Sequence, residues 1–73
     1  INIYPNPILD VINVKSSILI EEINIFDYFG KLVLAKKEST KEIQIKNDYL
    51  SSGSYIIVVK TQQGEFKDKI IVK

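Results

Sequence analysis

Residues 50–73 read LSSGSYIIVVKTQQGEFKDKIIVK, and this stretch decides the fold class. Two runs rich in β-branched and aromatic residues, Tyr55–Thr61 and Phe66–Lys73, flank the turn Thr61-Gln62-Gln63-Gly64. Glycine at the end of a type I turn can take the left-handed conformation that returns the chain to the ladder. The stretch therefore predicts a β-hairpin.

Runs of the same kind recur along the whole chain. Turn signals separate them about every 8–12 residues, a spacing typical of β-sandwiches and β-barrels. Ile23 and Ile25 alternate with Asn24, as a half-buried strand requires. A second hairpin turn is predicted at Asp27-Tyr28-Phe29-Gly30. The seven predicted strands are Asn2–Tyr4, Asp10–Lys15, Glu21–Phe26, Lys31–Lys37, Glu42–Lys46, Tyr55–Thr61 and Phe66–Lys73.

Alternation along the last two predicted strands assigns their faces. Tyr55, Ile57 and Val59 point inward. Ile56 and Val58 point outward, where they form a small apolar patch beside Ile71. The final strand places Phe66, Asp68, Ile70 and Val72 on one apolar face, and Lys67, Lys69, Ile71 and Lys73 on the other. The lysine face is either the solvated side of a core strand or, with the free terminal carboxyl group, a docking signal.

The composition indicates one small domain with a thin core. The chain has 73 residues and a formal net charge of +1, and its basic residues are all lysine. A chain of this length buries only about 60–65% of its unfolded surface. It has no cysteine, so aliphatic packing must stabilise the domain without disulfides. The small net charge and the lack of lysine runs argue against nucleic-acid binding.

The side chains that most often carry catalysis are missing. Without histidine or cysteine, the chain lacks the common general base, the thiol nucleophile and the usual zinc ligands. Its acids fall mostly at predicted strand ends and turns, where carboxylates are normally solvated. Calcium binding by loop acids stays open, although no Asp-x-Asp-x-Asp spacing is present. We expect a domain that is not an enzyme and has no cofactor and no small-molecule substrate.

No targeting or membrane-spanning segment is visible in the sequence. No stretch approaches the roughly 20 apolar residues of a membrane helix, and the first residues lack the regions of a signal peptide. We therefore expect a chain that does not span the membrane, with any export signal peptide on a larger precursor. The lack of cysteine suits passage through an oxidising compartment.

Two local motifs each have a structural and a functional interpretation. Pro5 and Pro7 stiffen the chain after Tyr4 and remove two backbone donors. This segment either bends a first strand and blunts its edge, or a partner recognises it directly. Leu50-x-x-Gly53-x-Tyr55 before a strand is typical of a tyrosine corner, in which the phenol bonds to upstream backbone. Tyr55 is thus a structural clamp or, alternatively, a ligand-binding tyrosine.

Four motifs, taken together and in order, resemble the type A C-terminal sorting domain of type IX secretion cargo proteins of Bacteroidota. They are Tyr4-Pro5-Asn6-Pro7, Phe29-Gly30-Lys31-Leu32-Val33, Leu50-x-x-Gly53-x-Tyr55 and Lys69-Ile70-Ile71-Val72-Lys73, and they span the whole chain. The pair Tyr28-Phe29 departs from the more polar residues usual in the family before the glycine. It leaves open an extra apolar contact at that hairpin.

The resemblance implies an immunoglobulin-like antiparallel β-sandwich, with residues 1–73 as one C-terminal domain of a larger secreted precursor. Such a domain passes through the periplasm and directs the cargo to the translocon and its shuttle proteins for export across the outer membrane. A sortase-like cysteine peptidase usually removes it, which leaves the cargo at the outer-membrane surface or outside the cell. The cleavage site is expected before Ile1.

The resemblance also implies which residues carry the signal. The family motifs, structural or recognised, include Tyr4, Pro5, Asn6, Pro7, Gly30, Lys31, Leu50, Gly53 and Tyr55. The residues expected to dock on the translocon are Lys67, Lys69, Ile71, Val72 and Lys73. The alternative function is a spacer or adhesion module that binds carbohydrate or protein, for which Tyr28, Phe29 and Tyr49 are the candidate aromatic platforms.

Overall fold

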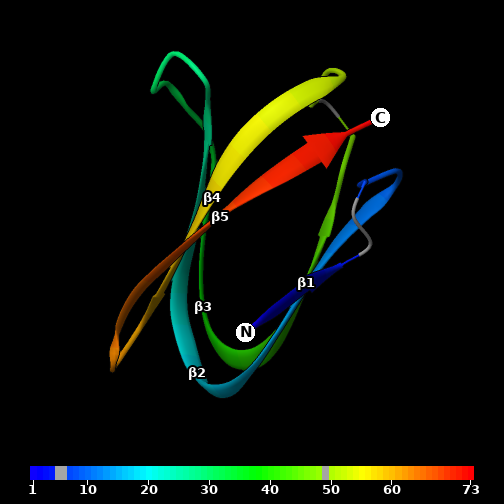
Figure 1. Ribbon diagram of the computed structural model, residues 1–73. Coiled ribbons are helices and arrows are strands. Elements are labelled where there is room, and N and C mark those ends of the chain that lie inside the picture. Colours follow the sequence, from blue (N-terminus) through cyan, green and yellow to red (C-terminus); the bar gives the residue numbers. More distant parts are fainter. Residues whose placement is uncertain (5–6, 49) are drawn as a thin grey trace.

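The computed structural model describes residues 1–4, 7–48 and 50–73. These residues form five strands: β1 (Asn2–Tyr4), β2 (Val11–Asp27), β3 (Leu32–Lys46), β4 (Gly53–Thr61) and β5 (Gly64–Val72). All strand pairs are antiparallel. The strands make one sheet of order β1-β2-β4-β5, with β3 paired to β2, and the sheet curls into a half-barrel (Figure 1). The prediction of an all-β, antiparallel fold is confirmed.

The predicted number of seven strands is wrong, because two long strands each contain two of the predicted ones. β2 includes most of Asp10–Lys15 and all of Glu21–Phe26, and β3 likewise joins Lys31–Lys37 to Glu42–Lys46. No glycine or proline interrupts either strand. Instead, the β2–β3 register shifts on either side of Ile20, and such bulges bend a strand without ending it. One curled sheet therefore replaces two separate predicted layers.

The two halves of β2 have different neighbours, as two separate strands would. The first half lies between β1 and the end of β3, through the pairs Ile3↔Val14 and Val14↔Ile43. The second half lies between the start of β3 and β4, through Ile25↔Leu34 and Ile25↔Ile57. The bend in β2 thus brings two sheet halves around one core.

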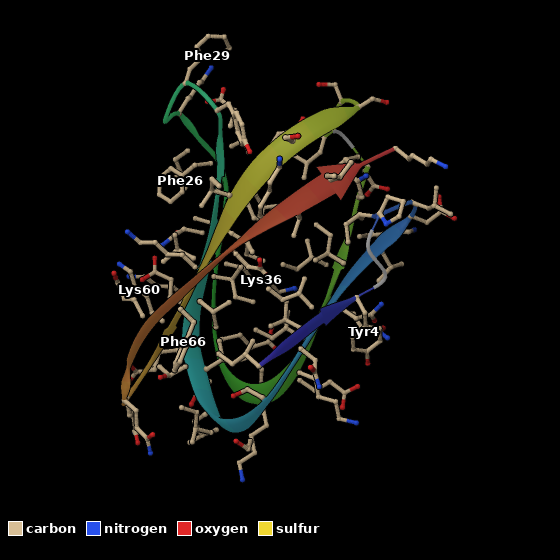
Figure 2. All side chains as sticks on the ribbon, in the orientation of Figure 1. Tyr4, Phe26, Phe29, Lys36, Lys60 and Phe66 are labelled. Carbon is tan, nitrogen blue, oxygen red and sulfur yellow. The ribbon has the colours of Figure 1, made fainter. Side chains whose placement is uncertain are left out.

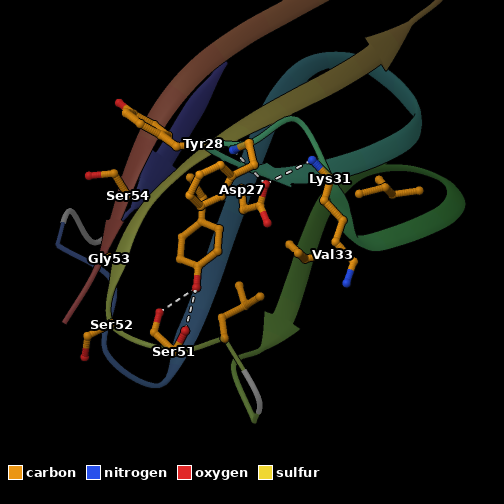
Figure 3. A pocket seen from close by; sticks show the side chains of 12 residues that line it. Asp27, Tyr28, Lys31, Val33, Ser51, Ser52, Gly53 and Ser54 are labelled. Carbon is orange, nitrogen blue, oxygen red and sulfur yellow. Dashed lines mark hydrogen bonds between the residues drawn. The ribbon is translucent and has the colours of Figure 1, made fainter.

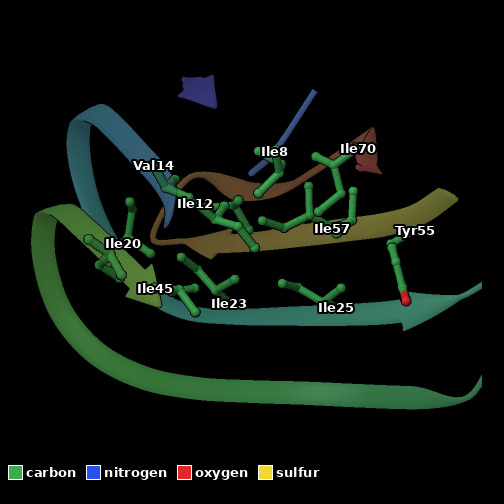
Figure 4. Close-up of a cluster of buried hydrophobic side chains, with 13 residues drawn as sticks. Ile8, Ile12, Val14, Ile20, Ile23, Ile25, Ile45, Tyr55, Ile57 and Ile70 are labelled. Atoms are coloured by element: carbon green, nitrogen blue, oxygen red, sulfur yellow. The ribbon is translucent and has the colours of Figure 1, made fainter. Parts of the chain in front are cut away.

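The core is a cluster of aliphatic side chains enclosed by the curl, with Tyr55 at one end (Figure 4). Its members are Ile8, Ile12, Val14, Ile20, Ile23, Ile25, Ile43, Ile45, Tyr55, Ile57, Val59, Ile70 and Val72. The predicted inward side chains of β4 are therefore confirmed. On β5 the prediction was partly wrong: Phe66 is 45% exposed, since the end of the β4–β5 hairpin projects past the core (Figure 2).

Asp27 organises the turn between β2 and β3. Its Oδ1 accepts hydrogen bonds from the N–H groups of Phe29 and Lys31, each at 2.9 Å. The Gly30 N–H donates to the Asp27 carbonyl at 3.1 Å, and Gly30 has a φ of 83°. That left-handed conformation suits glycine, so the predicted type I turn with a following glycine is confirmed.

Replacing Asp27 with alanine is expected to lower the free energy of unfolding by about 1–2 kcal/mol, because two turn N–H groups lose their acceptor. Urea denaturation of the purified domain measures this. Asp27→Asn, which retains one side-chain oxygen, should lose less. Equal stability of the alanine variant and the unmodified domain would contradict the role of Asp27 as a turn cap.

Ile8 connects the start of the chain to its end. The Ile8 N–H donates to the Ile71 carbonyl at 2.6 Å, and the Lys73 N–H donates to the Ile8 carbonyl at 2.9 Å. These bonds form a parallel bridge to Val72, and the Ile8 side chain is fully buried. Ile8 lies outside every predicted strand, but it closes one end of the half-barrel.

Candidate functional site

The predicted signal residues lie on separate parts of the domain. Pro5 and Asn6 are outside the described residues. Tyr4 ends β1 with 42% of its surface exposed, and Pro7 is also exposed. The remaining residues fall on two surfaces: the outer face of β5, and an open cavity at the end of the half-barrel where β2 joins β3.

The lysine-rich face of β5 points away from the core, as predicted. Lys67, Lys69, Ile71 and Lys73 are all exposed. Val72, by contrast, is 2% exposed and packs in the core. Four of the five predicted docking side chains therefore share one accessible face, and Val72 positions that strand from beneath.

The charge on this outer face is predominantly basic. Glu22 and Glu65 both approach the ammonium group of Lys60, at 3.7 and 3.8 Å. The Lys69 ammonium lies 5.6 Å from the centre of the Tyr28 ring, a cation–π distance. Within residues 1–4, 7–48 and 50–73, no carboxylate forms an ion pair with the lysines of β5. Glu22 and Glu65 thus pair with Lys60, and the charges of the β5 lysines are left for a partner to bind.

A shallow apolar depression of about 430 Å³ adjoins these lysines. Its lining includes Phe26, Tyr28, Ile56, Val58 and Lys67. Val58 lies on the predicted outer face but is only 7% exposed, so the expected patch is more covered than the sequence indicated. The cross-strand neighbours of Val58 are Asn24 and Lys67. The surface thus combines a recessed apolar floor with two charged residues at its margin, Lys67 and Asp27.

The second surface gathers motif residues that lie far apart in the sequence. A cavity of about 560 Å³ separates the β2–β3 hairpin from the loop before β4 (Figure 3). Lys31 lines it from the hairpin, and Leu50, Gly53 and Tyr55 line it from the loop and β4. Gly30 forms the turn above them. Two family motifs therefore meet at one end of the domain.

Tyr55 fixes the loop before β4. Its hydroxyl donates to the Ser51 carbonyl at 2.6 Å and lies 3.3 Å from the Ser51 Oγ (Figure 3). The Tyr55 ring itself is 7% exposed and belongs to the core. Gly53 has a φ of 150°, a backbone conformation that residues with a side chain rarely adopt. The structure thus confirms the tyrosine clamp and shows a structural reason for Gly53 and Tyr55.

Tyr55→Phe is expected to lower the free energy of unfolding by about 0.5–1.5 kcal/mol, because the part-buried hydrogen bond to the Ser51 carbonyl is lost while the ring packing is kept. Tyr4→Phe is the matched control, since the Tyr4 side chain is 42% exposed. Urea denaturation curves of the two variants give the comparison. If both lose the same small amount, the Ser51 bond does not hold this loop.

The tip of the β2–β3 hairpin exposes two aromatic side chains. Phe29 is 98% exposed at the tip (Figure 2). Tyr28 is 58% exposed. Tyr28 is engaged by Lys69 and so belongs to the basic outer face. Tyr49, the third candidate platform, lies outside the described residues. In the sequence, this tip is marked by the pair Tyr28-Phe29, which departs from the more polar residues usual in the family at these positions.

The described residues hold no side-chain cluster of the kind that binds a metal ion. Among them, no group of three or more histidine, cysteine, aspartate or glutamate side chains converges. No helix in that part of the chain is long and apolar enough to cross a membrane.

Comparisons with known proteins assign this chain to a family of secretion signals. Residues 2–73 match the family model for the secretion system C-terminal sorting domain. Ulvan lyase NLR42 of Nonlabens ulvanivorans is 35% identical over 75 residues, which cover 99% of this chain and 14% of that protein. No solved structure matches the chain. The chain belongs to the C-terminal sorting domains of type IX secretion cargo, a non-catalytic family that targets proteins for secretion.

Proposed function

We propose that residues 1–73 are the single sorting domain of a larger precursor, and that the export machinery recognises this domain in its folded state. The similar ulvan lyase supports the first part, since the matched region is 14% of that protein. The second part is supported by the placement of the signal residues. Lys67, Lys69 and Ile71 form one face only because β5 is held in the sheet.

The observation that carries this proposal is the row of lysines on β5 without acidic partners among the described residues. The direct partners proposed are the type IX translocon and its shuttle proteins, with an acidic docking surface. A sortase-like cysteine peptidase then removes the domain. The cargo accordingly passes through the periplasm to the outer-membrane surface or the medium.

A reporter fusion tests the proposed function. This chain is attached to the C-terminus of a fluorescent protein that carries a periplasmic signal peptide, and the fusion is expressed in a bacterium with a working type IX system and in a translocon-deficient strain. We expect external reporter, trimmed of the domain, in the competent strain alone. Reporter held in the periplasm of both strains, with the domain folded, would refute the function as a sorting signal.

The double variant Lys69→Ala/Lys73→Ala is expected to reduce export of this fusion at least tenfold, since two charges leave the docking face. Both lysines are exposed, so stability should fall by less than about 1 kcal/mol, including the contact of Lys69 with Tyr28. Lys41→Ala/Lys46→Ala, on exposed positions of β3, is the control of equal charge. If both double variants are exported like the unmodified fusion, the lysines of β5 are not the docking signal.

A further inference from the structure

The outer edge of β5 is an unpaired strand edge for most of its length. On its inner side, β5 pairs with β4 without a register shift from Gly53↔Val72 to Thr61↔Gly64. On its other side, within the described part of the chain, the backbone contact is with Ile8, through Ile71 and Lys73. That isolated parallel bridge shows that the backbone groups at one end of this edge already bond a second segment of the chain.

The direction of each backbone group along this edge follows from the Ile8 contacts. In an antiparallel strand, the N–H and C=O of one residue point to the same side, and successive residues alternate. Since the Ile71 carbonyl and the Lys73 N–H point to Ile8, the backbone groups of Lys69, Lys67 and Glu65 point to the same free side. Lys67 thus presents both a donor and an acceptor there.

One donor of the edge is already covered by a side chain. The Lys69 N–H donates to Oδ1 of Asp68 at 2.8 Å. Natural sheets protect exposed edges with such charged residues, which discourage unwanted pairing. The outer edge of β3 differs: there the Thr40 hydroxyl bonds both backbone groups of Glu42, at 3.1 and 3.3 Å. On β5, Lys67 has no such cover among the described residues.

The side chains along the edge define the strand that would fit. Lys67 and Lys69 flank it on the outer face, and the half-exposed Phe66 and the exposed Asp68 flank it on the other. The lysines repel a second copy of the same edge but attract carboxylates. A strand with acidic side chains toward the lysines and apolar ones toward Phe66 is therefore complementary.

We propose that the free edge of β5, centred on Lys67, pairs through its backbone with an extended acidic strand of the export machinery. This rests on the proposed function and adds its mode of binding. The backbone bonds supply attachment that is independent of the lysine side chains, while the lysines select an acidic partner.

The test separates the Lys67 backbone from the Lys67 side chain in the reporter fusion. Lys67→Ala removes the charge and keeps the edge N–H, whereas Lys67→Pro removes both. Proline is tolerated on edge strands where the N–H faces solvent. Gln44→Pro is the matched control on β3, because Gln44 follows Glu42 by two residues and its N–H points to that outer edge.

We expect export to fall about threefold for Lys67→Ala, which loses one charge of the docking face, to stay unchanged for Gln44→Pro, and to fall more than tenfold for Lys67→Pro, which also loses the edge N–H. Export of Lys67→Pro within threefold of Lys67→Ala would overturn the pairing and leave the sorting function intact. If the unmodified fusion is not exported, the sorting function itself fails. Folding is checked first by circular dichroism, and Glu65→Pro replaces Lys67→Pro if that variant unfolds. Unfolding of both variants would show that this edge is not free and would also overturn the proposal.

Discussion

Ile57→Ala is expected to lower the free energy of unfolding by about 2–5 kcal/mol, because it leaves a cavity in a fully enclosed site. Ile57 has no exposed surface and pairs with Ile25 at the centre of the curled sheet. Domains of this size have a total stability of only about 4–11 kcal/mol. The substitution thus removes a large fraction of that stability. Urea denaturation followed by circular dichroism measures the loss, since the chain has no tryptophan whose fluorescence could report unfolding.

Leu9→Ala is the matched control for Ile57→Ala. It removes a branched aliphatic side chain of the same size, but Leu9 is 59% exposed. Its expected loss is less than about 0.5 kcal/mol. Similar losses for the two variants would contradict a core centred between β2, β4 and β5.

Asn24→Leu is expected to raise the free energy of unfolding by about 1–3 kcal/mol, which corresponds to a rise of roughly 4–24 °C in Tm. Asn24 is 7% exposed, and its Oδ1 is buried without a hydrogen-bond partner among the described residues. It lies between Ala35 and Val58 on the outer face. A leucine there removes the desolvated oxygen and adds apolar contact.

Asn47→Leu provides the opposite case. Its Oδ1 accepts from the Leu50 N–H at 3.1 Å, and its Nδ2 donates to the Leu9 carbonyl at 3.2 Å. The same substitution should therefore destabilise the domain by about 1–3 kcal/mol. If thermal unfolding shows that Asn24→Leu also destabilises, then Asn24 has a stabilising contact in solution, and the account of its buried oxygen is wrong.

The sequence predicts the strand positions well because turns and alternation are local properties. Glycines after polar turn residues mark the hairpins at Gly30 and Gly64, and alternation correctly assigns the inward face of β4. The long strands were missed for a physical reason. Gaps are predicted at residues 16–20 and 38–41, but the strands continue through them with shifts in register, because β2 and β3 bend together.

The candidate site was predicted less completely, because it depends on contacts between distant segments. Alternation places three lysines and Ile71 on one face of β5, but it cannot show that Lys60 forms ion pairs with Glu22 and Glu65. Nor can it show that Ile8 closes the end of the β5 edge and leaves Lys67 open. The meeting of the Lys31 and Tyr55 motifs around one cavity likewise follows only from the curl of the sheet.

The central claim is that the export machinery reads a folded domain, and one experiment tests it directly. Export of the reporter fusion, divided by total reporter, is measured for the unmodified chain, Ile57→Ala and Ile57→Ala/Asn24→Leu, beside the folded fraction of each. The account predicts that export falls with Ile57→Ala and recovers in the double variant to the extent that folding recovers. Full export of an unfolded Ile57→Ala domain would contradict it, because a linear stretch of sequence would then be the signal.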